Sequence, residues 1–178
     1  MRRSLLPFVV AALVLAGQLL PHERNVTPLR AAALFSGATF ASPAAALLVP
    51  LGAYLAGGVA VGALRGDWSY GFHALAPVVY ASVALCVLLG FALRSRRRAL
   101  PIAAGTLAGA ILFFLVTNFA VWWALGTFPP TAAGLALCYA AGLPFLLNSL
   151  VGDAAYALVL FGGLAFAERV LAARAAWR

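Results

Sequence analysis

Long apolar runs, separated by short polar segments, make up most of this sequence. A helix needs about 20 predominantly apolar residues to cross a membrane, and most of the runs approach that length. The pattern therefore predicts an all-α, polytopic membrane helix bundle with about six transmembrane helices. The predicted helices occupy residues 4–20, 27–40, 44–64, 74–93, 102–125 and 144–167.

The C-terminal tail, residues 129–178, allows two interpretations. It contains two apolar runs, 131–143 and 144–167. If both crossed the membrane, the arginines after residue 167 would lie on the side opposite the basic loop 94–98. If only the second crosses, these arginines and the N-terminal arginines all lie on one side. The positive-inside rule favours this second arrangement, with both termini cytoplasmic and with 130–143 as an external helix or a re-entrant segment.

The composition supports the membrane class. The chain has 178 residues, of which 65% are hydrophobic and only 9% are charged, too few to cover the surface of a soluble enzyme. The same composition excludes an intrinsically disordered chain. Six spans of about 20 residues leave little else, so we expect a single integral membrane domain over residues 1–178. The lipid bilayer is its first predicted partner.

The charged and metal-ligating residues narrow the function further. All twelve basic residues are arginines, and they lie at the chain ends and in short loops, which indicates orientation in a membrane and no nucleic-acid partner. Cys86 and Cys138 lie in apolar runs without the spacing of a metal site. His22 and His73 have no carboxylate or cysteine at ligand spacing. We therefore expect no metal and no cofactor.

Sequence motifs of enzymes are absent. The chain has no H-E-x-x-H, no G-x-S-x-G, no P-loop and no pair of carboxylates spaced for acid–base chemistry. We predict that it is not an enzyme, and any ATP-driven role would need partner subunits.

Most polar residues other than arginine fall in segments that the predicted topology places outside the cell. This asymmetry indicates that binding chemistry opens outward, toward a small molecule received from outside. A carboxylate at membrane depth, such as Asp153, usually faces the interior of a bundle or a cavity. The predicted substrate-binding residues are Asn25, Asn118, Trp122, Cys138, Asn148 and Asp153.

Most of these residues also have a structural interpretation. Asp153 could stabilise the start of a helix or pair with an arginine. Asn118 could tie two helices together, and Asn25 could cap the second helix. Cys138 could be a small buried apolar residue, and Trp122 an anchor at the membrane interface.

Small residues four positions apart on three predicted helices are typical of close helix packing. Such pairs let two helix backbones approach each other, within one chain or between subunits. The predicted helix-packing residues are Ala12 and Ala16, Gly58 and Gly62, and Gly105 and Gly109.

Several segments together resemble a known family. The stretch NVTPLRAAALFSGATF at 25–40 is similar to an N-F-T-P…A-L-F-x-G-A-x-F signature, and FFLVTNFAVW at 113–122 and GLALCY at 134–139 match further segments. With Leu143-Pro-Phe145 and Gly152-Asp153, the matches cover most of the chain. The family is an uncharacterised group of small bacterial membrane proteins, a domain of unknown function whose members are described as transport proteins.

This family is distantly similar to the substrate-binding S-components of energy-coupling-factor (ECF) vitamin transporters. The resemblance implies six helices, an outward-facing ligand pocket, a small-residue face on the first helix that meets a transmembrane partner, and ATPase partner subunits. The pair Ala12 and Ala16 fits such a face. Three positions depart from the related proteins, so biotin, cobalt and nickel are not supported as ligands. Ala154-Ala155 replace the lysine of biotin-type members, Gly57-Gly58 replace a frequent aspartate, and Arg2 replaces the second residue of an N-terminal Met-His.

Two functions are consistent with these features. The first is an S-component-like, substrate-capturing subunit for uptake of a small nutrient or vitamin-like molecule across the bacterial cytoplasmic (inner) membrane. The alternative is a structural accessory subunit of a larger respiratory or photosynthetic membrane complex, because the many small residues suit packing against partners. Polar groups that converge on a cavity would favour the first, and a dry bundle with a broad small-residue outer face would favour the second.

Overall fold

The computed structural model describes residues 3–21, 23 and 25–176, and over those residues its regular structure is entirely helical. This confirms the all-α part of the predicted fold class, whereas the predicted cytoplasmic location of both termini stays a prediction. Arg2, His22 and Arg178, which entered the arguments above, lie outside the described residues. In chain order the elements are η1 (Arg3–Leu5), α1 (Leu6–Leu19), α2 (Leu29–Thr39), α3 (Pro43–Arg65), η2 (Trp68–Tyr70), α4 (Ala76–Ala92), α5 (Ala99–Leu125), α6 (Ala132–Ala157), η3 (Leu158–Gly162) and α7 (Gly163–Ala176).

Local sequence signals explain several helix ends. The Ser42 side chain accepts a hydrogen bond from the backbone N–H of Ala45, and Pro43 occupies the first position of α3. The same helix ends at Gly66, whose φ of 68° lies in the left-handed region that glycine tolerates. Asp67 then accepts from the N–H of Ser69 to begin η2. Hydrogen bonding with Ser69, first with its side chain and then with its backbone, lowers the pKa of the Asp67 carboxyl.

Three helices within the described residues are long and apolar enough to cross a membrane. They are α3, α5 and a continuous helix of 44 residues, Ala132–Ala175, that joins α6, η3 and α7. Helices α1 and α4 are apolar but shorter. These lengths support a membrane protein, whereas the predicted number of six spans is not confirmed.

Helix α2 accounts for part of that difference. The run 27–40 was predicted to be one of the six spans, but the helix has 11 residues and a length of about 16 Å, well below the ~30 Å of a hydrocarbon core. Every residue from Leu29 to Ala38 is buried, and α2 contacts α1, α3, α4, α5 and α6. It is therefore the centre of the bundle.

The segment 130–143 corrects a second prediction. It is neither a separate external helix nor a re-entrant segment, because α6 begins at Ala132 and continues through Pro144. Thr131 caps its start by accepting from the N–H of Gly134 at 3.1 Å. Proline removes one backbone N–H, which membrane helices tolerate. The whole helix of 44 residues extends about 66 Å, roughly twice a hydrocarbon core.

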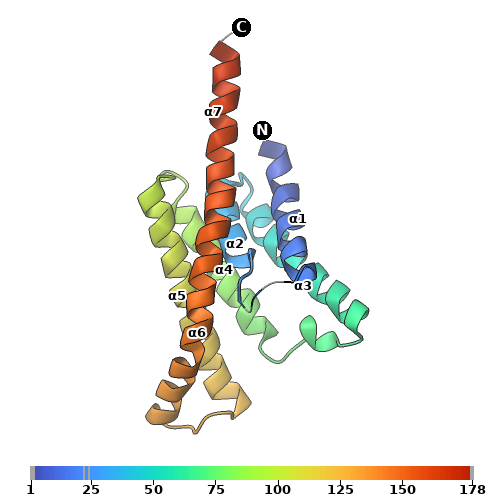
Figure 1. The fold of residues 1–178 in the computed structure, drawn as a ribbon, viewed down its shortest axis with the longest axis vertical. Helices are drawn as coiled ribbons and strands as arrows, with labels where there is room; N and C mark the ends of the chain where they lie inside the picture. Colours follow the sequence, from blue (N-terminus) through green and yellow to red (C-terminus); the bar gives the residue numbers. More distant parts are fainter. Residues whose placement is uncertain (1–2, 22, 24, 177–178) are drawn as a thin grey trace.

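The helix ends are distributed in an ordered way (Figure 1). The start of α1, the end of α7 and the loop between α4 and α5 lie toward one end of the molecule, and the hairpin between α5 and α6 lies at the other. Helix α7 extends beyond the rest of the bundle. The basic loop 94–98 is thus at the same end of the molecule as the start of α1 and the end of α7.

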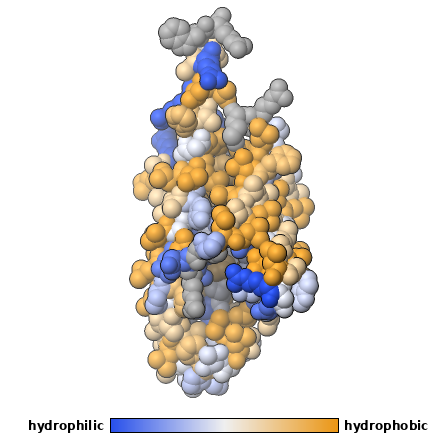
Figure 2. Space-filling view, turned by 45° about the vertical axis from the view of Figure 1, so that its right-hand side comes forward, coloured by the Kyte–Doolittle hydropathy of each residue, from blue (hydrophilic) through white to orange (hydrophobic). Residues whose placement is uncertain are grey.

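The molecular surface is largely apolar. Figure 2 shows hydrophobic side chains over most of one face, with strongly hydrophilic ones near the free end of α7 and in a smaller group lower on the same face. Large exposed residues include Leu107 and Trp123 of α5, which are 48% and 75% exposed. An apolar surface of this extent is unusual for a soluble monomer and fits contact with lipid.

Candidate functional site

A buried ion pair joins the central helix to the long C-terminal helix. Arg30, in the first turn of α2, donates from Nε to Oδ2 of Asp153 on α6 over 2.8 Å. The two side chains are 7% and 1% exposed. Within the described residues this is the one ion pair, and an ion pair at such depth is a candidate functional site.

The Arg30 guanidinium has two further contacts besides Asp153. A terminal nitrogen of the Arg30 guanidinium donates to the carbonyl oxygen of Asn25 over 3.5 Å, and Cζ of Arg30 lies 4.8 Å from the centre of the Phe113 ring. Asn25 has a φ of 64°, a left-handed conformation that asparagine tolerates better than most residues. The segment between α1 and α2 is brought close by Gly152, because a Cβ there would lie 3.1 Å from Cα of Val26.

The carboxylate is only partly satisfied. Oδ1 of Asp153 is buried and has no hydrogen-bond partner among the described residues. The pair borders a cavity of about 10 Å³, space for roughly one water molecule. Its lining comes from α2, α4, α5 and α6 and consists of Arg30, Ala31, Leu34, Cys86, Gly105, Thr106, Gly109 and Asp153.

The predicted substrate-binding residues do not form one cluster. Asn118 and Cys138 lie where α5 crosses α6, and the thiol of Cys138 donates to the carbonyl of Asn118 over 3.3 Å. The Asn118 side chain donates to the Phe114 carbonyl on its own helix and lies against Gly142, where an added Cβ would approach its Oδ1 within 2.6 Å. Gly142 and Asp153 are 11 positions apart on one helix, or about 16 Å.

Of the remaining two candidates, Trp122 lies apart from the ion pair, and Asn148 is five positions before Asp153 on α6. Trp122 donates from its indole N–H to the carbonyl of Pro129, at the end of the molecule where α5 turns into α6. Asn148 is exposed on α6. The structure therefore brings Asn25 and Asp153 together through Arg30, and it groups Asn118 with Cys138 elsewhere.

Arg30 is the site residue that the sequence interpretation missed. It was counted among the arginines at the chain ends and in short loops, although it falls within the predicted helix 27–40. The available signal was its position directly before the apolar run. A residue in the first turn of a helix is surrounded by the same neighbours as the rest of that helix, so a buried helix buries its first-turn arginine. The possibility that Asp153 pairs with an arginine was considered, but no partner was named.

The small residues have different surroundings. An added Cβ at Gly58 would lie 2.9 Å from Cα of Gly71, and one at Gly62 would lie 3.3 Å from the Trp68 ring. Gly105 faces Leu93 and Gly109 faces Cys86. On α1, Ala12 is exposed and Ala16 is partly buried.

The fold and the buried pair define the class of protein, a small helical membrane protein with a charged pair in its interior. Residues 1–175 match the model of a family described as Family of unknown function (DUF6580), and the chain belongs to this family. No curated protein and no solved structure matches the chain. The family description names no ligand, activity or partner.

Metal binding has no geometric support in the described part of the chain. No three His, Cys, Asp or Glu side chains come together there.

Proposed function

We propose that this protein is the substrate-capturing subunit of a membrane uptake system and that it binds a small polar molecule between Arg30 and Asp153. One observation carries the proposal: the Asp153 carboxylate is 1% exposed, and only one of its oxygens has a partner within the described chain. Charged residues at membrane depth are costly and usually line the path of a substrate or an ion.

A purely stabilising role explains the pair less well. Burial of two charges costs several kcal/mol per ion, and mutual attraction offsets this only when the remaining hydrogen-bonding positions are satisfied. Arg30 has such additional contacts with Asn25 and Phe113, but Oδ1 of Asp153 has none among the described residues. A ligand that donates to this oxygen would complete the site.

The two side chains suggest the chemistry of the ligand. A guanidinium binds carboxylate, phosphate or carbonyl oxygens, and an ionised carboxylate accepts from N–H or O–H groups. The matching molecule carries an acceptor and a donor close together, as a zwitterionic or amide-containing nutrient does.

Access to the site requires movement. The cavity of about 10 Å³ is far smaller than the roughly 300–1,000 Å³ of an ordinary ligand pocket. The segment between α1 and α2 lies over the pair, with Val26 against Gly152 and Asn25 against Arg30. We infer that this segment moves away from α6 when the ligand enters.

The orientation and the partners belong to the same proposal. The basic loop 94–98, the start of α1 and the end of α7 lie toward one end of the molecule (Figure 1), and the positive-inside rule supports a cytoplasmic location for that end. The exposed Ala12 and the partly buried Ala16 leave α1 accessible to a transmembrane partner. ATPase subunits would then supply the energy, as the S-component resemblance implies, in a bacterial cytoplasmic membrane.

The rival function, a structural subunit of a larger complex, has weaker support. Its argument was the number of glycines, but most of these already pack within the chain. Gly37 lies against Gly90, Gly58 against Gly71, and Gly62 against Trp68. Gly52, Gly66, Gly126 and Gly163 have open space where a Cβ would be, and they do not form a continuous stripe.

Native mass spectrometry of the protein, extracted gently from the membrane in which it is made, tests the proposal. The informative variant is Arg30→Met with Asp153→Leu, because replacing both members of a buried pair by apolar residues of similar size is often neutral for stability. We expect a small molecule bound to the wild type and none bound to the folded double variant. Asn118→Leu is the matched control and should keep the ligand, because Asn118 is on α5 and lies against Gly142, which is about 16 Å along α6 from Asp153.

Two outcomes would contradict the proposal. The first is a folded double variant that retains the small molecule of the wild type. The second is a wild-type protein that carries stoichiometric subunits other than ATPases or a transmembrane partner, and no small molecule, which would support the structural role.

A further inference from the structure

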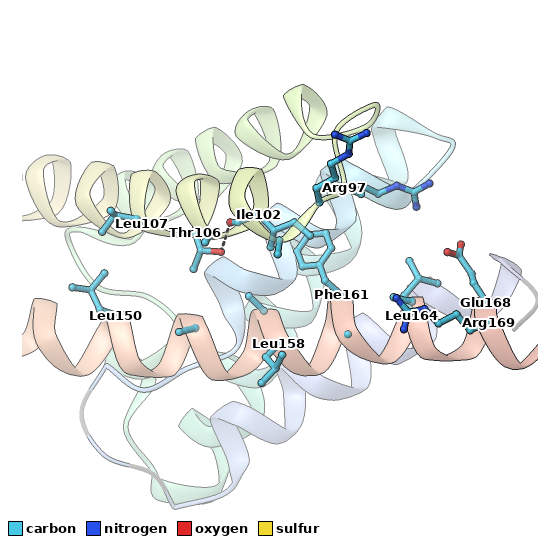
Figure 3. A pocket seen from close by; sticks show the side chains of 17 residues that line it. Arg97, Ile102, Thr106, Leu107, Leu150, Leu158, Phe161, Leu164, Glu168 and Arg169 are labelled. Atoms are coloured by element: carbon cyan, nitrogen blue, oxygen red, sulfur yellow. Dashed lines mark hydrogen bonds between the residues drawn. The ribbon is translucent and has the colours of Figure 1, made fainter.

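A second and larger hollow lies between α5 and the long C-terminal helix. Its volume is about 860 Å³, comparable to a pocket for a drug-sized ligand. One wall is the first half of α5 and the other is formed by the end of α6, η3 and the start of α7. Figure 3 shows Ile102, Thr106 and Leu107 facing Leu150 and Phe161 across this groove.

Small residues on both walls explain why the groove is open. Ala103 of α5 lies opposite Ala154, Ala157 and Gly162 on the other wall, so side chains do not fill the space. At the far end of the same two helices, Gly142 lets Asn118 approach closely. The helices are therefore in contact at one end and separated at the other. The π-helical turn η3 contributes Leu158 and Phe161, and such turns frequently mark functional sites.

The two ends of the groove differ in charge. Arg97, Arg98 and Arg169 lie at one end with a single acid, Glu168. These three arginines are exposed, and within the described chain their guanidinium groups make no hydrogen bond or ion pair. The rest of the lining is almost entirely apolar. An elongated apolar groove with a cationic rim matches a molecule that has a hydrocarbon body and an anionic head.

We propose that this groove binds an anionic phospholipid, with its phosphate against Arg97, Arg98 and Arg169 and its acyl chains between α5 and α6–α7. The walls include exposed parts of two membrane-spanning helices, with Leu107 48% and Leu158 75% exposed, so acyl chains reach the groove from the side. Arginine forks bind phosphate oxygens well, and basic pockets between transmembrane helices select anionic headgroups. The site is separate from the Arg30–Asp153 pair and does not depend on the ligand proposed there.

Lipid retention measures this selectivity directly. The full chain is placed in nanodiscs with equal amounts of phosphatidylglycerol and phosphatidylcholine that carry identical acyl chains, then released and examined by native mass spectrometry. We expect one phosphatidylglycerol per chain, preferred over phosphatidylcholine by about tenfold or more.

Two pairs of variants separate the headgroup from the acyl chains. Arg97→Gln with Arg169→Gln should abolish the preference, while Arg96→Gln with Arg174→Gln, which removes two arginines from the same loop and the same helix outside the groove, should keep it. Ala154→Phe fills the groove and should reduce retention of both lipids. Its neighbour Ala155→Phe lies outside the lining and should change neither.

Three results would overturn the proposal. They are equal retention of both lipids by the wild type, equal loss of preference in the two arginine pairs, and a lipid-free dimer that Ala154→Phe converts to a monomer. The last would mean that a second copy of the chain fills the groove. Far-UV circular dichroism of each variant establishes that it is folded.

Discussion

The shortest and the longest single α-helices of this protein, α2 and α5, have opposite surroundings. Helix α2 has 11 residues and is buried from Leu29 to Ala38, although it contains an arginine and a serine. Helix α5 has 27 residues and is strongly apolar, yet only Gly109 and Ala110 are buried. In this bundle, apolar character does not indicate which helix lies inside.

The physical reason is the solvent. Lipid tails are as apolar as leucine, so large apolar side chains gain little from facing inward, and close packing and polar contacts determine which helices associate. Helix α2 has small residues that allow close approach, and Ser36 donates to the Ala46 carbonyl of α3 at 2.8 Å. The two proposed sites follow the same division: a closed, charged site at α2 and an open, apolar groove along α5.

Removal of the Arg30 charge from α2 should cause the largest loss in the free energy of unfolding. Arg30→Met leaves Asp153 buried without its partner, and breaking a buried pair in this way costs about 3–5 kcal/mol. The free energy of unfolding in mixed detergent micelles, followed by circular dichroism, measures the loss. The double change Arg30→Met with Asp153→Leu should recover most of it, and a double variant as unstable as the single one would show that the pair has an additional structural role.

The sequence predicted the class of this fold better than its interior. The boundaries of the apolar runs indicated the helices, and Asn25 and Asp153 were both selected. Arg30 was not, because an arginine at the start of an apolar run looks like part of a loop when no partner is visible 123 positions away. The position of α2 at the centre was also missed, since hydropathy cannot distinguish a lipid-facing helix from a buried one.

Replacing a leucine by alanine on α2 and on α5 should give the next largest difference in the free energy of unfolding. Leu34 of α2 is 2% exposed, while Leu115 of α5 is 48% exposed. Leu34→Ala would enlarge the cavity beside the ion pair and should cost about 2–5 kcal/mol. Leu115→Ala should stay within about 0.5 kcal/mol. Equal losses in the same unfolding assay would mean that α5 is covered by protein in the membrane and not by lipid.

The long C-terminal helix shows a second limit of the sequence. The distribution of arginines favoured a new span that begins near residue 144, with 130–143 as a separate segment. In water, proline often ends a helix, because the freed backbone groups can bind water instead. In the hydrocarbon core there is no water to bind them, so the helix continues through the proline. The positive-inside rule then applies to one continuous helix, Ala132–Ala175, which is longer than the membrane is thick.

A third comparison concerns glycines at close and at open positions. Gly37 of α2 faces α4, where a Cβ would meet the Val87 carbonyl and lie 3.0 Å from Cα of Gly90. These are backbone atoms that cannot move aside, so Gly37→Ala should destabilise by about 1–3 kcal/mol. Gly52→Ala on α3, with nothing within 4 Å of the added Cβ, should be neutral or slightly stabilising. A stable Gly37→Ala protein would contradict the close approach of α2 and α4.

The smallest of the four effects concerns the end of α2 that faces away from the ion pair. Arg94 donates from Nε to the Gly37 carbonyl at 3.0 Å and from a terminal nitrogen to the Phe40 carbonyl at 3.1 Å. A cation that satisfies the last carbonyls of a helix also interacts favourably with the negative end of its dipole. Arg94→Met should therefore reduce the free energy of unfolding by about 1–2 kcal/mol. Arg96→Met, in the same loop but without such contacts among the described residues, should leave it unchanged. If the two variants were equally stable, the basic loop would serve orientation in the membrane alone, and α2 would be held in place by packing and by Arg30.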